Sequence, residues 1–231
     1  NGEEFDIDRL LQAYVERKAG VSSDSRIYKT RFKAERDTCV AFLLDMSSST
    51  NELANDSGKR ILDVEKEALI LISEAISALG DDFAIYGYSG YGKDQVAFYT
   101  IKEFEEVYDI RIQNRIGNIS WKMENRDGAA IRHATKRLST MPSKGKLLII
   151  LSDGKPLDCG CDQYFDGYAQ SDTRFALRQA RQQGIRPFCI TVDPYGQRYL
   201  PSLYGEQSYA VITKVEQLPQ KLPRIYRRLT R

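Results

Sequence analysis

Residues 38–50 have the sequence Thr-Cys-Val-Ala-Phe-Leu-Leu-Asp-Met-Ser-Ser-Ser-Thr, in which an apolar run leads directly into an aspartate and a series of hydroxyl side chains. An uninterrupted apolar run is typical of a strand buried on both faces, as in parallel sheets that helices cover on each side. Asp45, Ser47 and Ser49 would then lie just beyond the carboxyl end of this strand. The stretch therefore predicts the class of fold and the edge of the sheet that carries polar chemistry.

Two further runs, residues 146–151 and 187–192, have the same apolar character and predict two more buried strands. Residues 83–88 and 95–101 alternate on either side of a glycine-rich loop, which is typical of two neighbouring strands. A last short strand is expected at residues 209–213. Strands that alternate with longer helices indicate βαβ units, and so we expect an α/β fold with a doubly wound, mostly parallel sheet.

Helical periodicity separates these strands. Apolar and other inward-facing residues at steps of three and four predict a helix over residues 61–79, ended by Gly80. The positions that make these steps are Leu62, Glu65, Leu69, Ile72 and Ile76. Two further helices are expected over residues 128–138 and 173–183, and the second should begin after Asp172.

The ends of the chain predict additional helices. A terminal helix over residues 215–229 contains two prolines, so that it should start near Pro219 or be broken at Pro223. Amphipathic spacing near the beginning of the chain predicts another helix. We expect residues 1–36 to form an N-terminal helix and arm, and residues 37–231 to form one domain.

Composition excludes several classes of protein. The chain is 42% hydrophobic and 29% charged, which is ordinary for a globular protein. Its 34 Lys and Arg against 32 Asp and Glu give a net charge of +2, too small to indicate a nucleic-acid partner. No apolar stretch is long enough to span a membrane. The four cysteines (Cys39, Cys159, Cys161 and Cys189) form no disulfide framework, and a reducing cytoplasm is therefore expected.

Two strands end with aspartate at the same predicted edge. Asp45 follows the strand at residues 38–44, and Asp153 follows the strand at residues 146–151. In sheets of this kind, ligands bind outside the carboxyl ends of the strands. Two carboxylates together with the hydroxyls of Ser47 and Ser49 form an all-oxygen ligand set. Such a set suits Mg²⁺, with Mn²⁺ and Ca²⁺ as alternatives, and does not suit zinc.

The pattern Asp45-x-Ser47-x-Ser49 resembles the metal-ion-dependent adhesion site of von Willebrand factor A domains. The apolar strand that ends in Asp153 is similar to the strand that carries the later metal-site aspartate of the same family. The resemblance covers residues 37–231. It implies a doubly wound sheet with one antiparallel edge strand, which matches the closely spaced pair of strands before residue 102.

One position departs from this family. The family usually supplies a threonine from a middle loop as a further metal ligand, whereas the corresponding loop of this chain carries Asp127. The resemblance therefore implies that Asp127 takes the place of that threonine. A third carboxylate would neutralise the cation more fully and would weaken its attraction for an acidic side chain of a partner.

Several longer motifs narrow the resemblance to the NorD/CbbO group of bacterial activation proteins. They are residues 127–134 (Asp-Gly-Ala-Ala-Ile-Arg-His-Ala), 153–158, 184–193 and the ending 218–229. Membership of this group implies a non-enzymatic adaptor that works with a MoxR-type AAA+ ATPase. The target enzyme would be nitric oxide reductase or Rubisco, and an acidic residue of the partner would complete the metal site.

Other interpretations stay open at this point. Asp45, Ser47 and Ser49 could cap a helix, and Asp127 could be a cap or turn residue. Carboxylates around Mg²⁺ could also orient water for a metal-assisted phosphoester hydrolase. Against that, the sole histidine, His133, is poorly placed to act as a general base. Finally, the same surface could bind partners without any metal.

Overall fold

The computed structural model describes residues 37–54, 58–154, 157 and 166–230. The N-terminal helix and arm expected over residues 1–36 lie outside the described residues. No helix in the described part of the chain is long and apolar enough to cross a membrane.

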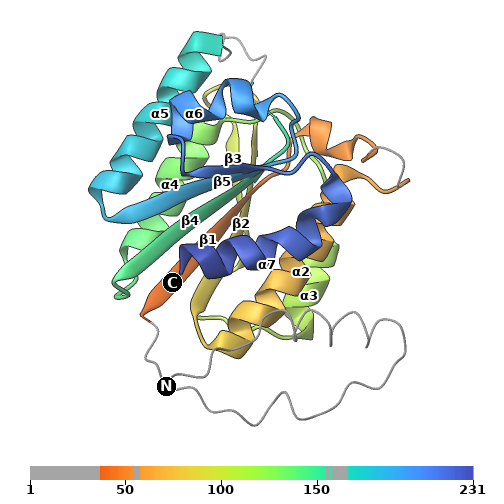
Figure 1. Cartoon of the computed structure of the whole chain (residues 1–231), viewed down its shortest axis with the longest axis vertical. Coiled ribbons are helices and arrows are strands. Elements are labelled where there is room, and N and C mark those ends of the chain that lie inside the picture. Colours follow the sequence, from red (N-terminus) through yellow and green to blue (C-terminus); the bar gives the residue numbers. More distant parts are fainter. Residues whose placement is uncertain (1–36, 55–57, 155–156, 158–165, 231) are drawn as a thin grey trace.

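Six strands form one sheet in the order β3-β2-β1-β4-β5-β6 (Figure 1). β2 and β3 pair antiparallel at one edge, and every other neighbouring pair is parallel. The expected α/β sheet with one antiparallel edge strand is therefore confirmed. The strands are β1 (Thr38–Asp45), β2 (Asp82–Gly90), β3 (Val96–Lys102), β4 (Gly145–Ser152), β5 (Ile185–Thr191) and β6 (Tyr209–Val211).

Helices cover both faces of the sheet, as Figure 1 shows. One face packs against α2 (Ile61–Leu79), α3 (Ile110–Gly117) and α7 (Leu218–Leu229). The opposite face packs against α4 (Asp127–Ser139), α5 (Asp166–Gln182) and α6 (Leu200–Tyr204). Two hydrophobic clusters, one on each side of the sheet, thus form the core.

β1 lies in the middle of the sheet and is buried on both faces, as its apolar run predicts. Val40, Phe42 and Leu44 belong to the cluster beneath α2 and α7. Ala41 and Leu43 belong to the cluster beneath α4 and α5. Because side chains alternate along a strand, a strand covered by helices on both sides needs apolar residues at every position.

Helix boundaries agree with the sequence in α2 and differ in α5. α2 ends where expected, because Gly80 takes the left-handed conformation (φ 77°) that glycine adopts readily. α5 begins at Asp166, seven residues before the predicted start, so Asp172 lies within the helix and does not precede it. There the Asp172 side chain pairs with Arg132 of α4, a tertiary contact that local sequence does not reveal.

The C-terminal helix follows one of the two alternatives that its prolines allowed. α7 starts at Leu218, with Pro219 in its first turn, where a missing N–H costs nothing. Pro223 lies inside the helix and does not break it. The short helices α3 and α6 were not predicted, because eight and five residues hold too few apolar steps to be recognised.

Candidate metal centre

Asp45, the last residue of β1, is fully buried at the carboxyl end of the sheet. Its Oδ1 accepts a hydrogen bond from the backbone N–H of Ser47 at 2.8 Å. Its Oδ2 accepts one from Nδ2 of Asn125 at 2.7 Å and a longer one from Oγ of Ser152 at 3.4 Å. Burial raises the pKa of Asp45, and these hydrogen bonds partly offset the rise. The carboxyl group is therefore held firmly in one orientation.

The hydroxyls of Ser47 and Ser49 lie 3.0 Å apart, Oγ to Oγ. Ser47 is the N-cap of a four-residue 3-10 helix, η2 (Ser48–Asn51), but its side chain makes no capping hydrogen bond. Helix capping therefore does not account for the two hydroxyls. They converge on one point beside Asp45, as the alternate spacing of the motif predicts.

Asp153 follows β4 and reaches the same edge. Leu44 pairs with Leu151 in the parallel β1–β4 register, so Asp45 and Asp153 leave the sheet side by side. Burial and then the charge of Asp45 raise the pKa of Asp153 to about 7, while a hydrogen bond from Ser49 lowers it. Its Oδ1 is buried and has no hydrogen-bond partner among the described residues. This oxygen is thus available to a ligand.

Asp127 arrives from the other side of the sheet, as the first residue of α4. It is buried, and its Oδ1 accepts a hydrogen bond from the hydroxyl of Tyr88 at 2.8 Å. Burial, followed by the charge of Asp45, raises the pKa of Asp127 to about 7. The structure therefore brings Asp127 within electrostatic reach of Asp45.

The arrangement fits a hard divalent cation. The five predicted ligands offer only oxygen atoms, and burial followed by the charge of Asp45 raises the pKa of both Asp127 and Asp153. Within the described residues, no three carboxylate, histidine or cysteine side chains are close enough to hold an ion between them. Asp45, Asp127 and Asp153 are therefore not grouped closely enough to hold an ion by themselves, and the hydroxyls of Ser47 and Ser49 would have to complete the ligand set.

Three residues near this edge were not recognised as site residues from the sequence. Asn125 donates to Asp45, Tyr88 donates to Asp127, and the carboxyl group of Glu65 lies within electrostatic reach of Asp153. Asn125 had a local signal, since it stands two residues before Asp127 in the same loop. Glu65 had one as well, since it is a charged residue among the inward-facing steps of the predicted helix, whereas Tyr88 had none because it occupies a regular position of its strand.

The loop before α4 is tied to the serine motif by backbone hydrogen bonds. The N–H of Ser48 donates to the carbonyl of Met123 at 2.7 Å, and the N–H of Lys122 donates to the carbonyl of Met46 at 2.7 Å. The residues of this loop therefore stand beside the candidate metal centre.

Exposed apolar side chains surround the same edge, and we refer to them as the apolar rim. They come from the loops that follow η2, β2 and β4 and from the loop before α4. A group of large exposed apolar side chains on one edge is typical of a surface that binds another protein. The apolar rim consists of Leu53, Tyr91, Trp121, Met123 and Leu157.

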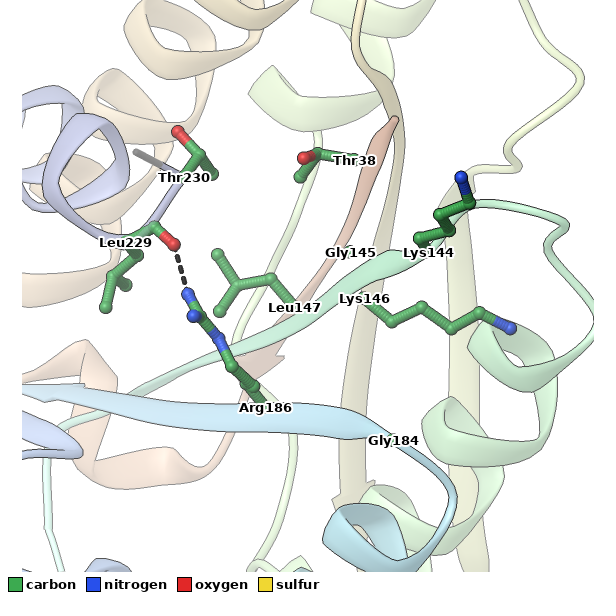
Figure 2. A pocket seen from close by; sticks show the side chains of 9 residues that line it. All are labelled: Thr38, Lys144, Gly145, Lys146, Leu147, Gly184, Arg186, Leu229 and Thr230. Carbon is green, nitrogen blue, oxygen red and sulfur yellow. Dashed lines mark hydrogen bonds between the residues drawn. The ribbon is translucent and has the colours of Figure 1, made fainter. Parts of the chain in front are cut away.

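A pocket of about 300 Å³ lies at the opposite edge of the sheet, where β1, β4 and β5 begin (Figure 2). Arg186 crosses it to donate to the carbonyl of Leu229 at the end of α7. Lys146 donates to the carbonyl of Ser139 at 2.8 Å, and in Figure 2 it points away from Arg186. The cations of this pocket thus have partners within the chain, and the pocket is separate from the candidate metal centre.

The order of the elements and the position of the aspartate–serine motif agree with a known family. The family model for the von Willebrand factor type A domain matches residues 40–227. The chain belongs to this family. Solved structures agree on the fold. The structure of von Willebrand factor type A from Catenulispora acidiphila matches with a TM-score of 0.56 and 13% identity. The match covers 84% of this chain and 42% of the Catenulispora chain. The PilB minor pilin from Streptococcus sanguinis gives a TM-score of 0.66 at 14% identity, covering 87% of this chain and 63% of the pilin.

Curated relatives are more similar in sequence. An uncharacterized protein of Pseudomonas aeruginosa is 40% identical over the whole chain, which spans 37% of that protein. Protein NorD of Stutzerimonas stutzeri is 37% identical over 94% of the chain, and Protein NorD of Brucella melitensis is 35% identical over 99%. The chain spans 35% and 36% of these two relatives, so it corresponds to one part of longer proteins.

Proposed function

We propose that residues 37–231 form a cation-dependent protein-binding domain that acts in the cytoplasm as an adaptor in an activation complex. Mg²⁺ would be held by Asp45, Ser47, Ser49, Asp127 and Asp153. The domain would dock a MoxR-type AAA+ ATPase onto a target enzyme, with nitric oxide reductase favoured over Rubisco by the NorD names of its relatives.

One observation carries the proposal: the edge buries several carboxyl groups and leaves an oxygen of Asp153 without a partner. Buried ionisable groups are costly unless they are paired or coordinate a metal. The pKa values of Asp127 and Asp153, raised to about 7, express that cost in the absence of a cation. A divalent cation held by these residues would remove this cost and could accept a further oxygen ligand from a partner.

The apolar rim supports a protein as the ligand. An acidic side chain of a partner would supply the remaining oxygen to the cation, and apolar residues beside it would pack against Trp121 and Met123. Membership of the von Willebrand factor type A family and similarity to NorD proteins support an interaction module rather than an enzyme.

The structure gives little support to a phosphoester hydrolase. His133 is the sole histidine, and its ring packs on that of Phe98 with centroids 4.3 Å apart. Burial and the neighbouring Arg137 and Lys136 lower the pKa of His133, and none of these influences comes from the metal edge. His133 is therefore not placed to activate a water bound at the metal edge.

A binding experiment tests the proposal. The cognate MoxR-type ATPase should be retained by the immobilised protein in Mg²⁺ and released in EDTA. Asp45→Ala should abolish retention, because Asp45 lies at the centre of the predicted ligand set. The metal would have no part in the mechanism if wild type in EDTA and Asp45→Ala in Mg²⁺ both retained as much ATPase as wild type in Mg²⁺. That result would favour metal-free binding.

Variants of exposed apolar residues test the rim separately. Trp121→Ala should weaken retention roughly tenfold or more, since large aromatic side chains dominate protein interfaces. Val107→Ala is the matched control, because Val107 is an exposed apolar residue outside the apolar rim. Equal losses in both variants would mean that the rim is not the docking surface.

A further inference from the structure

Glu65 is a buried carboxylic acid in the second turn of α2. Its side chain faces the sheet among apolar neighbours such as Leu62 and Leu69, and the residue is only 1% exposed. Its Oε2 is buried and has no hydrogen-bond partner in the described part of the chain. An ionisable group in such a position is almost never found without a partner of some kind.

The charges that act on Glu65 show what it faces. Burial has the largest effect on the pKa of Glu65 and raises it well above the ordinary value. The next two effects, also upward, come from Asp153 and then from Asp45. Glu65 is buried on the helix that packs on this face of the sheet, and it lies within electrostatic reach of both Asp153 and Asp45.

The two faces of the sheet explain this order. Ile149 and Leu151 of β4 face α2, and Asp153 continues that alternation beyond the end of the strand. Asp127 belongs to α4 on the opposite face. Acidic groups thus approach the edge from both sides: Glu65 and Asp153 from the α2 side, Asp127 from the α4 side.

This placement extends the candidate metal centre by one residue. We propose that Glu65 is a fourth acidic group of the centre, which stabilises the cation from the α2 side through a cation-bound water. The inference rests on the proposed cation site. A bridging water fits this role, because no three carboxylates of the described residues are grouped closely enough to hold an ion without further ligands. Mg²⁺ and Mn²⁺ suit this arrangement, since small hard cations keep part of their water shell in proteins.

Calorimetric titration of the protein with Mn²⁺, and then with Mg²⁺, tests the role of Glu65. Glu65→Gln should weaken cation binding tenfold to a hundredfold, the usual effect of removing a group that orients a metal's ligands. Its melting temperature in EDTA should be equal to or higher than that of wild type, because the variant no longer buries an unpaired acid. Glu67→Gln is the matched control, as Glu67 lies on the same helix but is paired with Lys59 at the surface.

Each outcome has a separate meaning. Affinity of Glu65→Gln within twofold of wild type would overturn the role of Glu65 and leave the cation site intact. A wild-type protein that takes up neither cation would overturn the cation site and Glu65 together. If Glu65→Gln does not fold, Glu65→Met removes the buried charge with an apolar side chain of similar size. It should fold and should show the same loss of affinity.

Discussion

The two edges of the sheet treat charge in opposite ways. At the edge where β1, β4 and β5 begin, Arg186 and Lys146 each donate a hydrogen bond to a backbone carbonyl. Nζ of the exposed Lys144 lies 4.0 Å from Oδ2 of Asp37. At the edge where β1 and β4 end, carboxyl groups are buried together, and an oxygen of Asp153 is left without a partner among the described residues.

The difference separates charged groups that already have a partner in the chain from carboxyl groups that are buried without one. A cation near water with a partner in the chain needs nothing more, and its contribution to stability is small. A buried carboxylate without a partner is a cost that folding alone does not recover. Among the residues that the structure describes, the buried carboxyl oxygens without a partner belong to Asp153 and Glu65, on the side of the sheet edge where the apolar rim also lies. We therefore assign binding to this edge and not to the pocket.

The largest expected effect comes from the centre of the metal edge. Asp45→Asn should reduce Mg²⁺ affinity by roughly a hundredfold or more, because it removes the charge of a proposed direct ligand. Loss of a group that acts only through another ligand costs less, typically tenfold to a hundredfold. Isothermal titration measures the affinity. Asparagine has the shape of aspartate, so circular dichroism and melting in EDTA should show a folded protein. Unchanged Mg²⁺ affinity in a folded variant would show that the buried carboxyl groups do not make this edge a cation site.

A moderate effect is expected from pH in the cation-free protein. The pKa values of Asp127 and Asp153 are about 7 in the folded state and near 3.8 when exposed. Between these values the folded state binds more protons, so the free energy of unfolding falls as pH rises and becomes level above pH 7. Urea unfolding in EDTA should therefore have a higher midpoint at pH 6 than at pH 8.

A matched variant sharpens the pH experiment. Asp127→Asn removes one of the two titrating groups, and its urea midpoint should depend less on pH than that of wild type. A midpoint that rises with pH in wild type would mean that the carboxyl groups of the metal edge are stabilised as anions by the fold itself.

The smallest effect is expected at the opposite edge. Lys144→Ala should change the free energy of unfolding by no more than about 0.5 kcal/mol, since the side chain is 92% exposed and its ion pair is long. Mg²⁺ affinity should be the same as in wild type. A severalfold change in affinity would show that the two edges are coupled through the sheet, and the comparison would then need revision.

Much of the fold follows from local patterns. The apolar run before Asp45 has to form a strand buried on both faces, and the steps of three and four from Leu62 to Ile76 have to form a helix. The antiparallel pair β2–β3 was predictable from a short loop. The start of α5 was not, because the contact between Asp172 and Arg132 joins two helices that are distant in sequence.

Local sequence was enough to place Asp45, Ser47, Ser49 and Asp153 at one edge of the sheet, because polar residues that follow buried parallel strands emerge at the same edge. The surroundings of these residues depend on packing between distant segments. The hydroxyl of Tyr88 reaches Asp127, and the carboxyl group of Glu65 comes within electrostatic reach of Asp153, because of how α2 and α4 pack on the sheet. Packing between distant segments sets burial and therefore pKa, so the local pattern could place the candidate ligands at this edge but could not predict the charge balance around them.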